Sequence, residues 1–526
     1  MARPTGKLDL DPVVIRKARA LAKRAAAPVE RLARSHSTVS VERAVLRLGG
    51  LTGADPRDLS NAPMPLVNAV VDAVREQVGL EQGAAMPVWD AMRKGNVASL
   101  NELADRVVKG EVTFRLPTGR DRDRATAAAR RGVAKGIARI DAQRANRDRM
   151  LRKVGDPTFP WIYLIVATGD IMEDIPQTQA AAREGADVVA VIRSTGQSLL
   201  DYVPEGATRE GFAGTYATQE NFRLMRAALD ETSKELGRYV RLTNYASGLC
   251  MPEIATLAGL ERLDMMLNDC MYGIIFRDIN PQRTFIDQRF SRQIHARAGI
   301  VINTGEDNYL TTADAVDAAH TVVVSQLLNE RFAKEAGLEE WQLGLGHAFE
   351  INPTIKDSFR LELAHALLVR ELFPDAPLKY MPPTKHMGGN IFAGYLLDGF
   401  FNLAGVMTEQ SIILVGMMTE GIVTPWLSDR DLSLENVRYV RDAVGSLADD
   451  FHPSPDGLIA TRARLVLSES IDLLERICDD TLLNAIADGT FGITKRPATG
   501  GKGLDGVITC APGYLNPARE LLEQAL

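Results

Sequence analysis

The segment from Arg193 to Ser198 carries the strongest local indication of chemistry in this chain. It reads Arg-Ser-Thr-Gly-Gln-Ser and combines a guanidinium group, three hydroxyl groups and one glycine. These groups suit a phosphate, because glycine lets backbone N–H groups approach an anion closely. Ser247, next to Gly248, offers another hydroxyl group after the following apolar run. The same residue types are common in turns, so phosphate binding and plain turn chemistry both stay open.

Two further segments offer groups that suit a planar cofactor and an amino-acid substrate. Tyr272 can stack on a flat ring, and Arg277 can pair with a carboxylate. Asp307 can hold an ammonium group, and Asn308 can bind a phenolic or hydroxyl oxygen. The alternatives are a core tyrosine beside a surface arginine for the first pair, and a helix N-cap for the second.

The later part of the chain adds lysines and acids that could face a substrate. Lys379 and Lys385 are each able to form a Schiff base or to bind a carboxylate. Glu420 can accept from a substrate amine, unless it is a solvated loop acid. His347 and Glu350 make only a weak metal pattern, because no third ligand accompanies them. Together these residues favour a small zwitterionic substrate and pyridoxal phosphate, without a metal.

Short apolar runs precede most of these polar segments and predict the strands that position them. The candidate strands are 161–167, 188–192, 240–244, 265–267, 299–302, 341–344, 378–381 and 413–417. The fourth run fits a helix equally well. Stretches with helical spacing lie between the runs, as at 219–236, 313–336 and 355–371. Eight strands alternating with helices predict an α/β fold, a (β/α)8 TIM-type barrel with its active site at the carboxyl ends of the strands.

Helical segments flank the predicted barrel on both sides. We expect a helical N-terminal extension over 1–156, the barrel over 157–430 and a mainly helical C-terminal region over 431–526. Asp11 and Pro12 are typical of a helix start, and an Ala- and Arg-rich helix is expected at about 120–151. The Gly- and Lys-containing segment 491–506 predicts a loop over the barrel mouth or at an interface.

Charge and cysteine usage exclude several classes of protein. Residues 1–150 hold 28 basic and 17 acidic residues, whereas the rest of the chain holds 33 and 51. Because the basic residues of the helix expected at about 120–151 are interleaved with Asp and lack stacking aromatic partners, they favour a solvated helix face over a nucleic-acid surface. None of the four cysteines forms a CxxC pair, which argues against zinc-ribbon, iron–sulfur and disulfide-scaffold proteins. With no apolar run typical of a signal peptide or a membrane span, the sequence predicts a cytoplasmic protein.

Six long strings carry a resemblance to a known family. They are IRSTGQSLLDYVPEG, LTNYASGLCMPEIA, NDCMYGIIFRDINPQRTFIDQ, INTGEDNY, LKYMPPTKHMGGNIF and GMMTEGIVTPW. These strings resemble the large (alpha) subunit of the lysine 5,6-aminomutases, which act on D-lysine or β-lysine. The resemblance covers nearly the whole chain and is least distinct in the N-terminal helices.

The resemblance implies a pyridoxal-phosphate barrel and assigns roles to residues. It implies that the cofactor phosphate is bound by Arg193, Ser198 and Ser247. It places Tyr272 against the pyridine ring and Asn308 near the phenolic oxygen. Substrate recognition is implied for Asp307, Arg277, Lys379 and Glu420. Tyr272, Asp307 and Lys379 form the expected catalytic set.

The resemblance also implies a partner. In the family, a smaller subunit binds adenosylcobalamin and supplies the Schiff-base lysine, and the two together perform a radical 1,2-amino shift from C6 to C5. This chain carries only half of the cobalamin pattern Asp-x-His-x-x-Gly, because Thr384 stands where the Asp would precede His386. The chain is therefore expected to be active only within an α2β2 complex. A self-contained pyridoxal-phosphate enzyme using Lys379 or Lys385, and a non-catalytic protein with a basic arm, are the alternatives.

Overall fold

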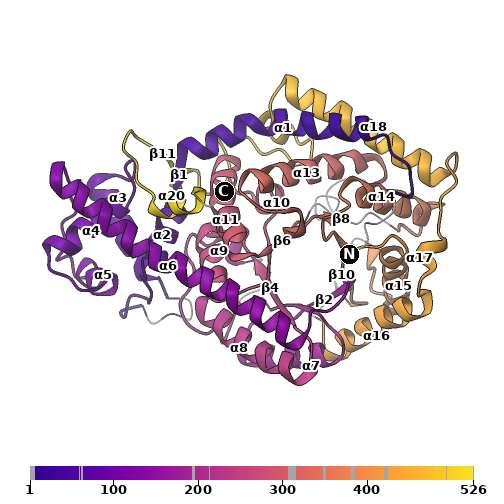
Figure 1. Ribbon diagram of the computed structural model, residues 1–526, viewed down its shortest axis with the longest axis horizontal. Helices are drawn as coiled ribbons and strands as arrows, with labels where there is room; N and C mark the ends of the chain where they lie inside the picture. The colour runs from indigo at the N-terminus through magenta and orange to yellow at the C-terminus, as the bar shows by residue number, and fades with distance from the viewer. Residues whose placement is uncertain are drawn as a thin grey trace.

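The computed structural model describes residues 6–58, 60, 63–191, 196–211, 214–305, 315–347, 351–380, 386–419, 425–492 and 494–524. Within these ranges the chain forms a ring of parallel strands surrounded by helices, with a helical lobe at one side (Figure 1). No helix in the described part of the chain is long and apolar enough to cross a membrane.

The parallel strands lie where the apolar runs predict them. They are β2 (Trp161–Ile165), β3 (Val188–Ala190), β4 (Arg241–Tyr245), β5 (Met265–Leu267), β6 (Val301–Asn303), β7 (Leu343–Gly344), β8 (Gly346–His347), β9 (Lys379–Tyr380) and β10 (Ile412–Leu414). The fourth run, which fits a helix equally well, is the strand β5. The expectation of a strand from Trp341 is wrong, because Trp341 lies in the 3-10 helix η2 (Glu340–Gln342) and the strand begins two residues later.

The ring closes through one interrupted strand. Only Leu345 separates β7 from β8; β7 pairs with β6, and β8 pairs with β9. The pair therefore occupies a single position in the ring, and the other seven strands connect β6 to β9 through parallel ladders. The structure confirms the predicted TIM-type barrel of eight strand positions.

Apolar side chains fill the interior of the barrel. Alternate residues of the strands point inward, as the period of two requires, and form one cluster. Its members are Trp161, Tyr163, Val188, Ala190, Met265, Val301, Ile412 and Leu414. The outward-facing residues pack against the surrounding helices, so the ring has a core on both of its faces.

The surrounding helices follow the strands in alternation. They are α7 (Ile171–Arg183), α8 (Gln219–Leu236), α9 (Met251–Leu260), α10 (Tyr272–Arg277), α11 (Pro281–Ala298), α13 (Ala315–Glu335), α14 (Ser358–Leu372), α15 (Ile391–Met407) and α16 (Leu427–Val444). The bounds of α8 match the sequence prediction, and α13 and α14 differ from theirs by one to three residues.

The N-terminal extension packs against the barrel. It comprises α1 (Pro12–Ser35), β1 (His36–Thr38), α2 (Val39–Leu48), α3 (Leu66–Val78), α4 (Ala85–Lys94), α5 (Leu100–Val108) and α6 (Gly119–Val154). Asp11 caps α1 as predicted, accepting from the Val13 N–H at 2.7 Å. The basic helix α6 buries one stripe and uses Arg147 for an ion pair with Asp264 at 2.8 Å. Its stripe is therefore docked on the body of the protein.

The C-terminal region returns to the N-terminal extension. It comprises α17 (Leu447–Asp450), α18 (Leu458–Asp479), α19 (Leu482–Ala487), η4 (Leu504–Gly506), β11 (Val507–Thr509) and α20 (Pro517–Glu523). α18 lies beside α1 along one edge of the molecule (Figure 1). The sequence does not predict β11, which pairs antiparallel with β1. The boundaries at 156 and 430 stay predictions.

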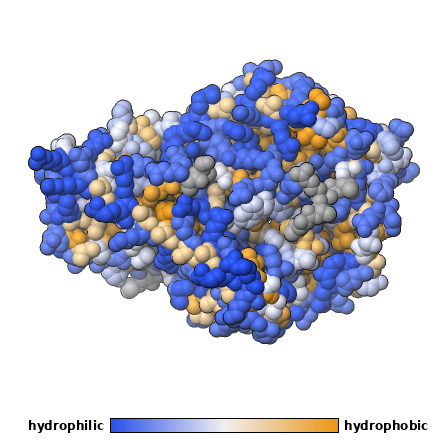
Figure 2. Space-filling view, viewed as in Figure 1, coloured by the Kyte–Doolittle hydropathy of each residue, from blue (hydrophilic) through white to orange (hydrophobic). Residues whose placement is uncertain are grey.

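The face of the molecule in Figure 2 is mostly hydrophilic, with hydrophobic side chains in scattered groups. The segment 491–506 lies against the start of α11: Asn280 donates its backbone N–H to the Lys502 carbonyl at 2.9 Å. Arg496 also donates to the Ile274 carbonyl at 3.1 Å. This segment therefore packs beside α10, the helix that carries Tyr272 and Arg277.

Candidate functional site

The loops that follow β3 and β4 lie against each other at the carboxyl end of the barrel. Ser198 lies in the 3-10 helix η1 (Gln197–Leu199), and its carbonyl accepts from the Leu249 N–H at 3.1 Å. Gly248 has φ +99°, and a Cβ atom there would lie 2.5 Å from the Ser198 backbone. Glycine is thus required for this close approach. The structure therefore brings Ser198 and Ser247 into neighbouring loops.

Ser247 has a hydroxyl group that is buried and unsatisfied. Its side chain is 3% exposed, and Oγ has no hydrogen-bond partner in the described part of the chain. A buried polar group without a partner costs roughly 1–3 kcal/mol, so an added acceptor such as a phosphate oxygen would relieve the cost. Gln197, which the sequence analysis did not single out, holds the loop by accepting from the Ala217 N–H at 2.6 Å.

Tyr272 and Arg277 form one unit on the short helix α10. The Tyr272 ring stacks on Phe276 with 5.4 Å between centroids, and the Arg277 guanidinium lies 4.7 Å from the Phe276 centroid. Arg277 Nη2 also donates to the Tyr272 hydroxyl at 3.3 Å. The buried Nε of Arg277 has no partner among the described residues. This arrangement offers an aromatic face beside a cation, which suits a planar anionic ligand.

Asp269 positions these groups, although the sequence analysis did not identify it. Its Oδ1 accepts from the backbone N–H groups of Met271 and Tyr272, both at 2.8 Å. Its Oδ2 accepts from the Gly305 N–H at 3.1 Å and from Asn329 Nδ2 at 3.2 Å. Burial raises the pKa of Asp269, which is fully enclosed. The carboxyl group thus joins the segment after β5 to the segment after β6. An acid two residues after a short strand is the sequence signal that could have indicated it.

Lys379 is buried in the barrel wall. Its side chain is 2% exposed, and it pairs with Ile412 of β10 in the parallel ladder. Partners in a parallel ladder face the same side, and Ile412 belongs to the interior cluster, so Lys379 lies on the interior face. The possibility that it is a surface lysine is excluded. It is the first residue of β9.

Comparison with known proteins agrees with this architecture. A family model described as the D-lysine 5,6-aminomutase TIM-barrel domain of the alpha subunit matches residues 8–521. The lysine 5,6-aminomutase alpha subunit of Acetoanaerobium sticklandii is 51% identical over 516 residues, which is 98% of either chain. The chain belongs to the lysine 5,6-aminomutase alpha-subunit family. The resemblance seen in the sequence is confirmed, and with it the class of enzyme, an isomerase.

Two further aminomutase subunits are similar to this chain, one at high and one at low sequence identity. The lysine 5,6-aminomutase alpha subunit of Fusobacterium nucleatum subsp. nucleatum is 50% identical over 513 residues, covering 97% of this chain and 98% of the relative. A D-ornithine 4,5-aminomutase subunit beta of Acetoanaerobium sticklandii is 27% identical over 335 residues, covering 63% of this chain and 45% of that protein.

His347 is a core histidine in this aminomutase subunit. Its Nε2 bonds to Gln410 Oε1 at 2.8 Å, and its ring packs 5.2 Å from the Tyr380 ring. Burial lowers the pKa of His347 to about 3, so the imidazole is neutral. No group of three or more potential metal ligands occurs in the described ranges.

Several predicted residues of the aminomutase site lie outside the described residues. They are Arg193, Asp307, Asn308, Glu350, Lys385 and Glu420. Of the described site residues, Lys379 lies within β9, whereas Ser198, Ser247, Tyr272 and Arg277 follow the strands β3, β4 and β5, which are consecutive neighbours in the barrel. They therefore share one side of its carboxyl end.

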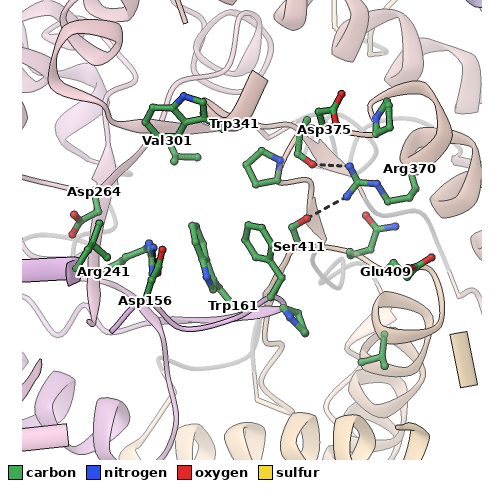
Figure 3. A pocket seen from close by; sticks show the side chains of 18 of the residues that line it. Asp156, Trp161, Arg241, Asp264, Val301, Trp341, Arg370, Asp375, Glu409 and Ser411 are labelled. Atoms are coloured by element: carbon green, nitrogen blue, oxygen red, sulfur yellow. Dashed lines mark hydrogen bonds and ion pairs between the residues drawn. The ribbon is translucent and has the colours of Figure 1, made fainter. Parts of the chain in front are cut away.

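A pocket lies at the opposite, amino-terminal end of the barrel (Figure 3). Trp161 is the first residue of β2 and Arg241 is the first residue of β4, and both line it. Catalytic sites of TIM barrels lie at the carboxyl end. This pocket is thus separate from the candidate aminomutase site.

Proposed function

We propose that this chain is the catalytic large subunit of a lysine 5,6-aminomutase that depends on pyridoxal phosphate and adenosylcobalamin. It would move the terminal amino group from C6 to C5 of D-lysine or β-lysine. The observation that carries the proposal is the buried hydroxyl group of Ser247, which has no hydrogen-bond partner among the described residues and lies beside Ser198 at the carboxyl end of a barrel of this family.

The described residues fit pyridoxal phosphate. Ser198 and Ser247 would hold the phosphate, together with Arg193, and Tyr272 would cover one face of the ring. Asn308 would bind the phenolic oxygen. When bound, pyridoxal phosphate holds the migrating nitrogen and adenosylcobalamin supplies the radical that begins the shift. The role of these residues is to orient the cofactor ring.

Substrate orientation falls to the charged residues of the barrel. Lys379 and Arg277 would pair with the substrate carboxylate, while Asp307 and Glu420 would hold ammonium groups. Because Lys379 is buried in the barrel wall, water is excluded from its contact with the substrate carboxylate. The attraction between opposite charges is stronger where water is excluded. Precise orientation matters because a reactive intermediate must rearrange before it meets another group.

Exposed apolar side chains beside the mouth support a partner subunit. α15 and α16 follow β9 and β10, so their first turns lie toward the carboxyl end of the barrel. Phe392 in the first turn of α15 is 82% exposed, and Trp426, which precedes α16, is 71% exposed. Further exposed apolar residues of these two packed helices are Ile391, Leu396, Phe400 and Leu427, and contiguous apolar patches mark protein interfaces. We assign this surface to the small cobalamin-binding subunit, which would supply the Schiff-base lysine in an α2β2 complex in the cytoplasm.

Reconstitution tests the function. The purified chain is combined with its small subunit, both cofactors and either D-lysine or β-lysine. Transfer of nitrogen from C6 to C5 gives 2,5-diaminohexanoate from the first substrate and 3,5-diaminohexanoate from the second, and chromatography separates each product from its isomeric substrate. We expect conversion only in the complete mixture. Conversion by this chain without the small subunit, or no conversion in the complete mixture, would refute the proposal.

The surface is tested by pull-down of the small subunit. Phe392→Asp should abolish capture, because an aspartate would be desolvated at the interface. Leu465→Asp is the matched control, since Leu465 is also an exposed apolar residue but lies on α18. Equal capture by both variants would contradict the assignment of the surface.

The buried Lys379 favours one alternative, a pyridoxal-phosphate enzyme complete in one chain. Borohydride reduction of the complex, followed by peptide mapping, separates the two functions. We expect the reduced cofactor on the small subunit. Its recovery on Lys379 or Lys385 of this chain would establish the alternative.

A further inference from the structure

The pocket at the amino-terminal end of the barrel has the dimensions of a ligand site. Its volume is about 760 Å³, within the range of pockets that hold small molecules. Trp161, Val301 and Ser411 contribute from the amino-terminal ends of three strands, and Trp341 contributes from η2. This end of a TIM barrel ordinarily serves stability alone, so an open cavity there calls for an explanation.

Arg370 is a buried cation on the wall of this pocket that makes no direct ion pair with any of the described residues. It is 5% exposed; its Nη1 donates to Ser411 Oγ at 3.2 Å, and its Nη2 donates to the carbonyl groups of Ala376 and Phe373. No carboxylate of the described residues lies within ion-pair distance of Arg370. The nearby Glu409 pairs with Lys7. Its buried Nε has no hydrogen-bond partner in the same ranges.

This arrangement disfavours the charged form of Arg370. Burial lowers the pKa of its guanidinium group to about 10, despite the nearby Glu409 and Asp375. Burying a charge without pairing it is strongly unfavourable. An anion in the pocket would supply the missing partner.

Arg241 is a second buried arginine that lines the pocket, on the side opposite Arg370. Its guanidinium carbon lies 3.6 Å from the centroid of the Trp161 ring, and it pairs with Asp156. Its buried Nη1 has no hydrogen-bond partner among the described residues. Figure 3 shows Arg241 and Arg370 on opposite sides of the pocket, with the Trp161 and Trp341 side chains on the remaining sides. The lining thus combines arginines with flat aromatic surfaces, and it also carries the carboxylates Asp148, Asp156, Asp264, Asp375, Glu409 and Asp449.

We propose that this pocket binds a small organic anion, with its acidic group on Arg370 and its flat apolar body beside Trp161. The acidic group can be a carboxylate, a sulfonate or a phosphate, because all three accept hydrogen bonds from a guanidinium group. The site is separate from the carboxyl-end mouth and does not depend on the function proposed above. Binding there adds a contact between α14 and the strands β2 and β10.

Fluorescence titration with 8-anilinonaphthalene-1-sulfonate, a flat aromatic sulfonate, tests the proposal on the full chain. Arg370→Gln should weaken binding of the probe about 10-fold or more, because a hydrogen bond to a charged group is lost. Arg438→Gln is the matched control, since Arg438 lies on α16 outside the pocket, and Ser247→Ala controls for the opposite mouth. Binding that is unchanged in Arg370→Gln, or weakened in Ser247→Ala alone, overturns the proposal.

Competition defines the ligand class. Benzoate should displace the probe at concentrations where inorganic phosphate does not, because only benzoate has a flat apolar body. Equal displacement by phosphate would overturn the requirement for that body. If Arg370→Gln does not fold, crystals of the wild-type chain soaked in 4-bromobenzoate replace it. A bromine anomalous peak beside Arg370 supports the site, and a peak only at the carboxyl-end mouth, or none, overturns it.

Discussion

Replacing Asp269 by asparagine tests whether one buried carboxyl group organises the mouth of the barrel. Among the described residues, each carboxylate oxygen accepts at least two hydrogen bonds, at 2.8 to 3.2 Å. An asparagine puts an NH2 group in the place of one oxygen, so either orientation of the amide leaves two buried donors without an acceptor. Each unsatisfied donor costs roughly 1–3 kcal/mol, or roughly 2–6 kcal/mol for two.

The neutral amide recovers part of this loss. Burial raises the pKa of Asp269, which shows that the ionised carboxyl group already bears a desolvation cost that asparagine would not. We therefore expect the free energy of unfolding to fall by about 2–3 kcal/mol, at the low end of that range. Cofactor affinity should fall as well, because Asp269 holds the first turn of the helix that carries Tyr272.

The assays are urea denaturation of the chain and pyridoxal-phosphate titration of the assembled complex. Asp264→Asn is the matched control. Asp264 is also buried and accepts from Arg147, Arg226 and the Leu242 N–H, all at 2.8 Å, but it precedes β5 whereas Asp269 follows it. It should lose stability and keep its cofactor affinity. If Asp269→Asn loses no more cofactor affinity than Asp264→Asn, Asp269 is a structural residue only and the reasoning fails.

Three other variants are informative. Ser247→Ala should fold normally and bind pyridoxal phosphate about 10-fold more weakly in the complex, because a hydrogen bond to a charged phosphate is worth roughly 1.5–3 kcal/mol; an unchanged titration would remove Ser247 from the site. Lys379→Met should keep the absorbance band of the bound cofactor in the complex and lose turnover; disappearance of the band would identify Lys379 as the anchoring lysine. Burial lowers the pKa of His295 to about 3, so the unfolded chain binds the extra proton first as the pH falls below 6.5. His295 therefore lowers the free energy of unfolding by about 1.4 kcal/mol at pH 5.5 relative to pH 7.5. In urea denaturation, His295→Phe should remove this dependence on pH. His452→Phe, at an exposed position, is the control and should not remove it.

The strand positions were predictable because each combines a buried apolar run with a polar segment at its end. Two runs were exceptions. Met265–Leu267 fits a helix as well as a strand, and only pairing with both neighbours decides between them, whereas Trp341 lies in a 3-10 helix before its strand. The strand pair β1 and β11 could not be predicted, because two three-residue segments far apart in sequence carry no detectable periodicity.

The site was predictable where chemistry and spacing coincide in one segment. The adjacent Ser247 and Gly248 are an example, since glycine and hydroxyl group stand next to each other. Asp269 was missed because its described partners, which include Tyr272, Gly305 and Asn329, come from different segments that only the fold brings together. The amino-terminal pocket was missed for the same reason: Arg370 and Arg241 become neighbours of one cavity only when the barrel closes.

The pairing of β1 with β11 has a consequence for biosynthesis. His36, Ser37 and Thr38 find their ladder partners at Thr509, Ile508 and Val507. A ribosome makes about 5–20 residues each second, so this N-terminal strand waits at least some 20 seconds for its partner to emerge. During that time an unpaired strand edge is available to other chains, which is the condition under which aggregation competes with folding. The assembly of this subunit is therefore exposed to chaperone control until its last strand has been synthesised.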